Sequence, residues 1–382
     1  MTRSQSSLVR HTPVLSNDFR AQWELVGTRV LAAVQRVGEG GCLILGPEVR
    51  AFEGELAQTW GVAFCVGCAS GLDALEIALR CAGLESGDEV LTTPLSAFAT
   101  SLAIVRAGGV PLFVDVDESG QLDLDLAEEA LARRPSIAFL LPVHLYGHAM
   151  DLERLYALRD RFGIRVVEDC AQAVGARSRG RPVGTGSDPA ATSFYPTKNL
   201  GCMGDGGAVL ASCEAEADLA RSLRDYGQVA RYEHRHLGLN SRLDELQAAI
   251  LRDALLPELP RLTARRVEIA SRYREEIRNP GLRIPPVPKG SESVWHLFPV
   301  LVTSERDSFQ EYLRRADIAS GVHYPRLIPE QQAFLDARVS AVLGPLKNAE
   351  AFARREVSLP IHPFLTEPEI ERVVASCNSW RG

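Results

Sequence analysis

Short apolar runs alternate with amphipathic segments through the first half of the chain. Runs with the length of buried strands occur at residues 62–66, 90–92, 110–116, 137–143 and 165–167. Segments in which apolar residues recur at helical spacing lie between them, at 71–81, 96–106, 124–132 and 152–162. Near-continuous apolar strands alternating with helices are typical of a parallel sheet with both faces covered. The pattern therefore predicts an α/β fold with a mostly parallel sheet.

The flanking segments predict further helices and a second domain. Ser16 can cap a helix over about 18–37, and Pro47 can open another over 48–60. Later helices are expected at 213–225, 240–256, 262–277, 308–316, 348–357 and after Thr366, and strands at 297–302 and 318–324. We therefore expect a disordered tail (1–12), a large domain (13–250) and a small C-terminal α/β domain (251–382), with room for the N-terminal helix to pack on the small domain.

Composition and charge exclude several classes of protein. The chain has 382 residues, which is long for a single core, and its 46% hydrophobic and 24% charged content is that of a soluble globular protein. A formal net charge of −7 argues against general binding to nucleic acid or to a membrane surface. No stretch approaches the roughly 20 apolar residues of a membrane span. The polar N-terminus lacks the apolar core of a secretion signal, so we expect a cytoplasmic protein.

The eight cysteines are scattered along the chain, which predicts reduced thiols. Cys65 and Cys68 form a C-x-x-C pair. A zinc site would need a second ligand pair at suitable spacing, and none is evident. We interpret the pair as small core residues at a strand end, and we expect no metal.

One lysine in the second half stands out by its position. Lys198 lies on a Pro-containing turn between two apolar runs, 192–195 and 208–210, with glycines at 201, 204, 206 and 207. A lysine held between buried strands is costly unless it is paired, and enzymes use such amines with a lowered pKa to form Schiff bases. A solvated turn lysine fits the same local pattern, so other residues must decide.

Residues that directly follow strands are the next candidates, because ligands bind at the carboxyl ends of parallel strands. Ser70-Gly71-Leu72 turns into a helix N-terminus, where free N–H groups favour phosphate. This turn is neither a P-loop nor a dinucleotide fingerprint. Phe98 follows the next strand and could stack on a flat heterocycle or pack in the core. Glu168-Asp169 ends a buried strand, and a carboxylate there can pair with a protonated pyridine nitrogen.

Taken in order, these motifs resemble the DegT/DnrJ family of nucleotide-sugar aminotransferases. The resemblance covers about residue 45 to the C-terminus and rests on Leu45-Gly46-Pro47-Glu48, Ala69-Ser70-Gly71-Leu72-Asp73, Pro142-Val143-His144-Leu145-Tyr146-Gly147, Val167-Glu168-Asp169-Cys170-Ala171-Gln172, Ser193-Phe194-Tyr195-Pro196-Thr197-Lys198 and Gly238-Leu239-Asn240-Ser241-Arg242. It implies a fold type I, aspartate aminotransferase-like protein. Such a protein has a mostly parallel seven-stranded sheet sandwiched by helices, plus a smaller C-terminal α/β domain.

The resemblance also implies pyridoxal 5'-phosphate (PLP) as cofactor and roles for matching residues. Lys198 would form the Schiff base and move the proton, and Asp169 would pair with the pyridine nitrogen. Further cofactor contacts would come from Ser70, Gly71, Leu72, Phe98, Gln172, Ser193 and, from a neighbouring subunit, Asn240. Substrate contacts would come from His144, Tyr146, Arg231, His236 and Tyr324. A homodimer with shared active sites follows from the role of Asn240.

Two departures from the family pattern affect these expectations. The family usually has Thr where Leu72 stands, so one side-chain contact to the phosphate should be missing. A His-x-Gln pattern often follows the position of Tyr324, and Ile328-Pro329-Glu330-Gln331 lacks its histidine.

The implied reaction moves an amino group from L-glutamate to a keto group of a nucleotide-linked, dTDP-type deoxysugar. Pyridoxamine phosphate is the intermediate form of the cofactor. Amination at C-3 of the sugar is weakly preferred over C-4. An inosose aminotransferase, a PLP-binding regulator without turnover and a nicotinamide oxidoreductase are the alternatives. The last lacks its glycine fingerprint.

Overall fold

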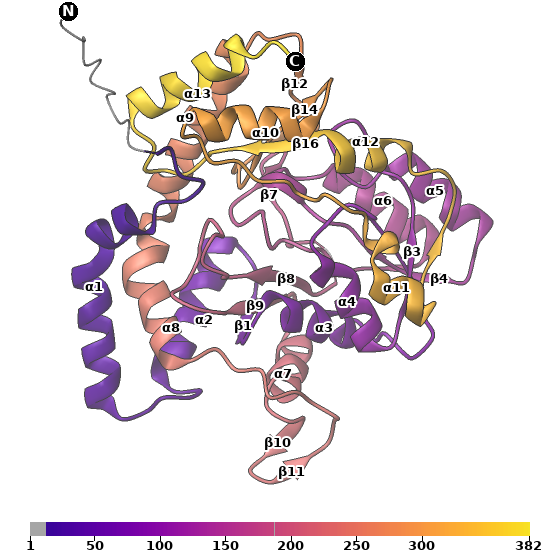
Figure 1. The fold of residues 1–382 in the computed structure, drawn as a ribbon. Coiled ribbons are helices and arrows are strands. Elements are labelled where there is room, and N and C mark those ends of the chain that lie inside the picture. Colours follow the sequence, from indigo (N-terminus) through magenta and orange to yellow (C-terminus); the bar gives the residue numbers. More distant parts are fainter. Residues whose placement is uncertain (1–12, 187) are drawn as a thin grey trace, which may run out of the picture.

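The computed structural model describes residues 13–186 and 188–382 of the chain, so the predicted tail at 1–12 lies outside the described residues. Its largest sheet is five-stranded and parallel (Figure 1). The strand order is β15 (Ala341–Val342), β3 (Val110–Phe113), β2 (Glu89–Thr92), β4 (Ile137–Leu141) and β5 (Arg165–Val166). A second sheet has the order β1 (Phe64–Cys68), β9 (Gly207–Ala211) and β8 (Ala190–Ser193), with β9 antiparallel to both neighbours.

The two sheets join at Asp169. This residue forms a parallel bridge with Val143 on one side and another with Ala191 on the other, so the strand direction continues from β4 and β5 to β8. The large domain thus contributes seven described strands to the joined sheet, β1 to β5, β8 and β9, and only β9 runs against the rest. The predicted, mostly parallel fold type I sheet is confirmed.

Alternating residues of the strands supply separate cores on the two faces of the sheet. Cys65 and Leu210 pack in one core, and their neighbours Val66 and Val209 pack in the other, as the two-residue period of a strand requires. The first core includes residues of α1 (Phe19–Gly40), α2 (Pro47–Trp60) and α8 (Glu245–Ile250). The second includes residues of α3 (Gly71–Cys81), α4 (Phe98–Ala107) and α7 (Glu214–Leu223). Helices α5 (Leu124–Arg133) and α6 (Leu152–Phe162) pack together over Leu91 and Leu140.

The C-terminal part forms its own antiparallel sheet of β12 (Leu282–Arg283), β14 (Phe298–Val302) and β16 (Glu356–Leu359). This sheet shares a core with α9 (Leu259–Glu276), α10 (Arg306–Arg315) and α13 (Glu367–Ser379). One segment departs from the predicted division into domains. Strand β15 pairs with β3, and Phe334 of α11 (Gln332–Ala337) packs on Phe113, so this part of 251–382 belongs to the large sheet.

The N-terminal segment connects both parts. Val14 pairs with Ile318 in the small domain, and α1 then crosses to pack on α8 and the π-helical turn Leu251–Leu255 that follows it (Figure 1). The helix cap is Asp18, whose side chain accepts the N–H groups of Arg20 and Ala21, and the prediction of Ser16 was wrong. Asp18 directly precedes the first helical turn, where its carboxylate reaches these free donors.

One further element prediction was wrong, and two predicted helices have different bounds. Residues 318–324 form isolated bridges at Ile318 and Gly321 and no strand. The expected helix over 240–256 begins only at Glu245, after an extended approach. The predicted helix at 348–357 ends at Arg355 as α12 (Lys347–Arg355), and the chain continues directly as strand β16.

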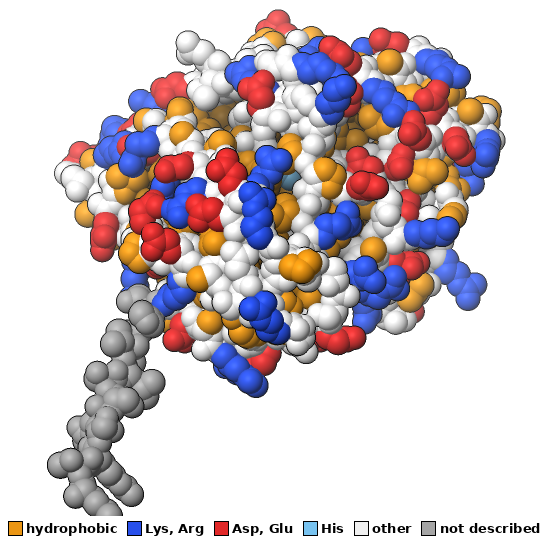
Figure 2. All heavy atoms as spheres, turned by 90° about the horizontal axis from the view of Figure 1, so that it is seen from above, with side chains coloured by type: hydrophobic (Ala, Val, Ile, Leu, Met, Phe, Trp, Pro, Cys, Tyr) orange, Lys and Arg blue, Asp and Glu red, His pale blue; other side chains and the backbone are white. Residues whose placement is uncertain are grey.

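The surface mixes charges of both signs. Figure 2 shows Lys and Arg side chains interspersed with Asp and Glu over the face it presents. Among the described residues, no helix is both long and apolar enough to cross a membrane.

Candidate active site

Asp169 lies where the two sheets join, at the ends of the parallel strands. Its side chain is almost fully buried, and its Oδ2 accepts a hydrogen bond of 2.9 Å from the Thr100 hydroxyl. Its Oδ1 accepts the N–H of Ala171 at 3.0 Å. Burial raises the pKa of Asp169, and these two hydrogen bonds with the charge of Lys198 oppose that rise. A cation placed against this carboxylate would keep it ionised.

Lys198 sits on the loop between β8 and β9, and the loop geometry is set by backbone contacts. The N–H of Lys198 donates to the carbonyl of Tyr195, and Cys202 N–H donates to Phe194. A Cβ at Gly201 would lie 2.3 Å from the Pro196 carbonyl oxygen, so this tight loop requires glycine there. Burial lowers the pKa of Lys198 to about 8, and the charge of Asp169 acts in the opposite direction. The amine therefore has the lowered pKa that nucleophilic lysines need.

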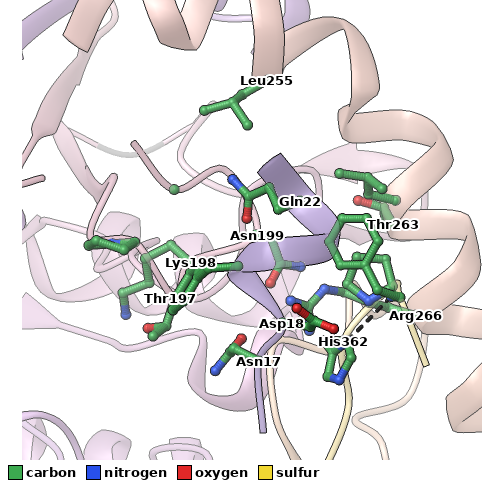
Figure 3. Close-up of a pocket in the computed structure, with 16 residues that line it drawn as sticks. Asn17, Asp18, Gln22, Thr197, Lys198, Asn199, Leu255, Thr263, Arg266 and His362 are labelled. Carbon is green, nitrogen blue, oxygen red and sulfur yellow. Dashed lines mark hydrogen bonds between the residues drawn. The ribbon is translucent and has the colours of Figure 1, made fainter. Parts of the chain in front are cut away.

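The Lys198 loop borders a cavity to which three parts of the chain contribute. Figure 3 shows Thr197, Lys198 and Asn199 together with side chains of the N-terminal segment, of α9 and of the loop before α13. Asn199 fixes the loop to the segment before β14 because its side chain donates to the Val294 carbonyl at 2.9 Å. The Lys198 loop thus lies where the N-terminal segment, α9 and the loop before α13 meet.

A cradle of backbone donors faces the same region. Ser70 caps α3 through a hydrogen bond from Asp73 N–H, and the Gly71 and Leu72 N–H groups make no hydrogen bond among the described residues. A Cβ at Gly71 would lie 2.5 Å from the Cβ of Ser193, so the two predicted residues are in direct contact. Free N–H groups at a helix N-terminus beside a serine hydroxyl form an anion site.

Gln172 and Tyr324 extend the site toward the small domain. Gln172 Nε2 donates to the Tyr324 hydroxyl at 3.3 Å, and its Oε1 accepts the N–H of Tyr146 at 2.7 Å. Phe98 is half-buried at the first residue of α4 and makes an edge contact with Phe334 at 5.4 Å between ring centres. The structure therefore brings most of the predicted cofactor contacts into one region, namely Ser70, Gly71, Leu72, Phe98, Asp169, Gln172, Ser193 and Lys198.

Thr100 is a residue that the sequence interpretation missed. Its hydroxyl is fully buried and binds Asp169 directly. The available signal was its place one turn into the helix after β2, two residues beyond Phe98. A threonine within a helix is ordinary, so nothing in the sequence favours a role in the site for this hydroxyl.

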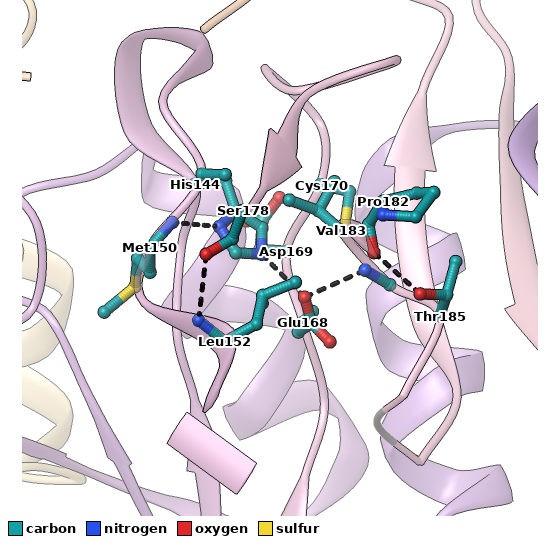
Figure 4. A network of polar contacts seen from close by, with 12 residues as sticks. His144, Met150, Leu152, Glu168, Asp169, Cys170, Ser178, Pro182, Val183 and Thr185 are labelled. Carbon is teal, nitrogen blue, oxygen red and sulfur yellow. Dashed lines mark hydrogen bonds and ion pairs between the residues drawn. The ribbon is translucent and has the colours of Figure 1, made fainter. Parts of the chain in front are cut away.

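His144 and Tyr146 do not lie where substrate contacts were predicted. Both are fully buried, which does not agree with direct contact to substrate. His144 Nε2 lies 2.7 Å from Glu168 Oε2, and its Nδ1 accepts the N–H of Met150 (Figure 4). Glu168 also accepts the Tyr156 hydroxyl and the Gly184 N–H. This network supports the strand end that carries Asp169.

The same network holds the three potential metal ligands that the described residues bring together, His144, Glu168 and Cys170. The oxygens of Glu168 are occupied by the protein donors named above. Burial raises the pKa of the Cys170 thiol far above its usual range, which disfavours the thiolate that binds metal. We therefore interpret these three residues as part of a hydrogen-bonded network that supports the strand end carrying Asp169.

Arg231, His236 and Asn240 are exposed in the single chain. They belong to or flank the hairpin of β10 (Gln228–Ala230) and β11 (Glu233–His234), which projects beside α7 (Figure 1). Tyr232 is 79% and Leu237 91% exposed on this hairpin. Within one chain these residues have no described contact with the site, so their predicted roles stay predictions.

The residues fit a planar pyridine phosphate by the chemistry of their donors. The buried carboxylate of Asp169 interacts electrostatically with Lys198, whose pKa is lowered. The third part is the cradle of backbone N–H groups at Gly71, where a Cβ would meet Ser193. Leu72 departs from this fit as expected, because its side chain packs against the core beneath the cradle and offers no hydroxyl.

Comparison with known proteins supports the same conclusion. The DegT/DnrJ/EryC1/StrS aminotransferase family matches residues 25–378. The chain is 42% identical to dTDP-3-amino-3,4,6-trideoxy-alpha-D-glucose transaminase of Streptomyces venezuelae, over 95% of either chain. It is 40% identical to dTDP-3-amino-3,6-dideoxy-alpha-D-galactopyranose transaminase of Aneurinibacillus thermoaerophilus, over 91% of this chain and 94% of the other.

A solved structure extends this similarity to three dimensions. The crystal structure of S. venezuelae DesV in complex with a ketimine intermediate superimposes with a TM-score of 0.92 at 41% identity. The match covers 97% of this chain and 99% of that one.

Proposed function

Because the chain belongs to the DegT/DnrJ/EryC1/StrS aminotransferase family, we propose that it transfers an amino group from L-glutamate to the keto group of a dTDP-linked deoxysugar. Family membership confirms the predicted aminotransferase class and the PLP cofactor. The observation that carries the proposal is the lysine of lowered pKa opposite the buried carboxylate of Asp169.

The residues around the site divide the chemical work. PLP, when bound, supplies the electron sink for moving an amino group between two carbon skeletons. Lys198 Nζ holds and moves the proton at the reacting carbon, because its lowered pKa lets it act in both directions near neutral pH. Asp169 supplies the negative charge against the ring nitrogen, and Thr100 holds the orientation of that carboxylate.

The preference for C-3 is supported by relatives. Three enzymes at 40% identity or more are named for dTDP-3-amino sugars, two for a trideoxyglucose and one for a dideoxygalactose. We extend this position to the present chain and leave the configuration of the sugar to experiment.

We also propose a homodimer in which each hairpin β10–β11 completes the other subunit's site. Support comes from the projecting hairpin, whose apolar side chains Val229, Tyr232 and Leu237 are exposed in the single chain. Exposed apolar groups beside basic residues are suited to a protein interface. Asn240 at the base of the hairpin would then approach the phosphate cradle of the partner, with Arg231 and His236 near its sugar nucleotide.

A panel of dTDP-linked 3-keto and 4-keto 6-deoxysugars tests the proposal, with L-glutamate as donor and NMR of the products. We expect amination at C-3 and release of 2-oxoglutarate. Amination only at C-4 would correct the position. Amination only of an inosose would overturn the substrate class, and absence of any amine product with cofactor bound would favour the regulator.

A further inference from the structure

Glu356 is a fully buried acid outside the cofactor contacts described above. It lies on β16 of the small domain and has no exposed surface. Its Oε2 accepts the backbone N–H of His323 at 2.6 Å, and its Oε1 lies 2.5 Å from the Ser358 hydroxyl. No other hydrogen bond to its carboxyl group occurs among the described residues. A buried carboxyl group with so few partners requires an explanation.

Ser358 connects this acid to an imidazole. Its Oγ lies 2.8 Å from Nδ1 of His323, so a single hydroxyl bridges the carboxyl group and the ring. The other ring nitrogen, Nε2, makes no hydrogen bond among the described residues. His323 and Ser358 line a cavity of about 250 Å³ together with His296 and Thr197, the neighbour of Lys198 in the chain. A chain of hydrogen bonds therefore connects the buried Glu356 carboxyl group, through Ser358, to a histidine that lines the cavity beside Lys198.

The hydroxyl can donate only one proton, and this couples the two ends. If Glu356 is ionised, Ser358 donates to it, and His323 must donate from Nδ1 to the Ser358 oxygen. The ring then presents a bare Nε2 to the cavity. If Glu356 is protonated, it donates to Ser358, which donates to Nδ1, and the ring carries its proton on Nε2 instead.

We propose that Glu356, Ser358 and His323 form a relay that determines whether Nε2 of His323 donates or accepts a hydrogen bond in the cavity beside Lys198. The switch moves one proton from the Glu356 carboxyl group to Ser358 Oγ, one from Ser358 Oγ to Nδ1, and one from Nε2 to an acceptor in the cavity. No bond other than these O–H and N–H bonds changes. His323 is a positioning residue for groups that meet Lys198.

The electrostatic surroundings support a switch near neutral pH. Burial raises the pKa of Glu356 to about 8, against hydrogen bonds from Ser358 and His323 and the charge of Arg306. Burial and the charge of Lys198 lower the pKa of His323 to about 4, so the ring stays neutral while Glu356 titrates. Tyr146 and Tyr324 also face this acid, and burial raises the pKa of both phenols, so both stay protonated. Nε2 should therefore donate below about pH 8 and accept above it.

The effect on turnover rests on the proposed function, whereas the switch itself does not. Neutron diffraction from crystals of the PLP-bound enzyme at pD of about 6.5 and about 9.5 locates the deuteron on His323. We expect it on Nε2 at the lower value and on Nδ1 at the higher one. A deuteron on the same nitrogen at both values would overturn the relay.

Two variants separate the relay from a purely structural role. In Glu356→Gln the amide oxygen accepts the backbone N–H of His323, which leaves the NH2 group to donate to Ser358. The deuteron should therefore stay on Nε2 at both pD values. Ser358→Ala removes the bridge, and the position of the deuteron should no longer change with pD. If either variant still switched as wild type does, the proposal would be wrong.

The glutamate half-reaction provides an independent readout of the same relay. The rate ratio of Glu356→Gln to wild type should stay near one below about pH 7 and change several-fold above about pH 9. This ratio cancels the titration of Lys198, which both proteins share. Glu330→Gln, a carboxyl-to-amide change in the segment just after Tyr324, should give a flat ratio. A flat ratio for Glu356→Gln as well would contradict a role in turnover.

Discussion

Single side chains carry most of what distinguishes this active site. Burial lowers the pKa of the Lys198 amine and raises the pKa of the Asp169 carboxyl group. The two pKa values therefore lie closer together than those of the free side chains. Leu72 is one of the two departures from the family pattern. It occupies a cradle whose remaining donors are backbone N–H groups and serine hydroxyls.

Restoring the missing hydroxyl should strengthen cofactor binding. Leu72→Thr adds one donor at the phosphate cradle, and a charge-assisted hydrogen bond corresponds to roughly tenfold in affinity. Absorbance titration of the apoenzyme with PLP measures the dissociation constant. Leu72→Val is the matched control, because it has the shape of threonine without the hydroxyl. Equal affinities for the two variants would show that position 72 does not contact the phosphate.

The single residues that could be predicted from the sequence are those whose charge is unexpected beside buried strands. A lysine on a turn between apolar runs and an acid at a buried strand end could be predicted because each is costly without a partner. Thr100 and the buried state of His144 could not, because a threonine within a helix and a histidine after a strand fit ordinary packing equally well. The partner of Thr100 is 69 residues away in sequence, and only the fold brings the two together.

At the scale of elements, the parallel strands place the site and α3 shapes its phosphate end. Alternation of apolar strands and helices predicted the sheet correctly because both faces are buried and the period is clear. The strand predicted over 318–324 was wrong, and the helix predicted over 348–357 ends two residues early at Arg355. Short apolar runs in the small domain suit a strand, a bridge or a helix end equally well. Their conformation is set by tertiary pairing, as between Ser358 and Gly321.

The close approach of α3 to β8 makes one glycine indispensable. Gly71→Ala would place a Cβ 2.5 Å from Ser193 Cβ and 2.9 Å from its Oγ, which must widen the cradle. We expect at least about a hundredfold loss of PLP affinity, since several phosphate hydrogen bonds weaken together. Gly54→Ala on the exposed side of α2 meets no atom within 4 Å and should leave PLP affinity unchanged. Unchanged affinity in Gly71→Ala would contradict the assignment of the cradle.

At the scale of the whole molecule, the proposed sites are shared between two subunits. Lys198 lies on the loop between β8 and β9, whereas Asn240 follows the projecting hairpin of β10 and β11 in the chain. Among the described residues of one chain, Asn240 makes no contact with Lys198. A dimer that exchanges hairpins would bring each Lys198 together with the Asn240 of the partner subunit.

Mixing two defective variants tests this sharing. Lys198→Ala and Asn240→Asp should each have little activity alone, the second because its carboxylate repels the phosphate. After subunit exchange, half of the dimers are mixed and one of their two sites is intact, so activity should return to about one quarter of wild type. Sedimentation of the mixture confirms the dimer. No recovery after proven exchange would mean that Asn240 serves its own chain.

The central claim is that Lys198 is the amine that holds the cofactor and moves the proton. The most direct measurement is the visible absorbance of the protein with PLP, followed before and after addition of L-glutamate, in wild type and in Lys198→Ala. We expect a band in wild type that disappears with glutamate, and in the variant neither that band nor turnover. A Lys198→Ala protein that aminates the sugar at the wild-type rate, or a wild type without the band, would contradict it.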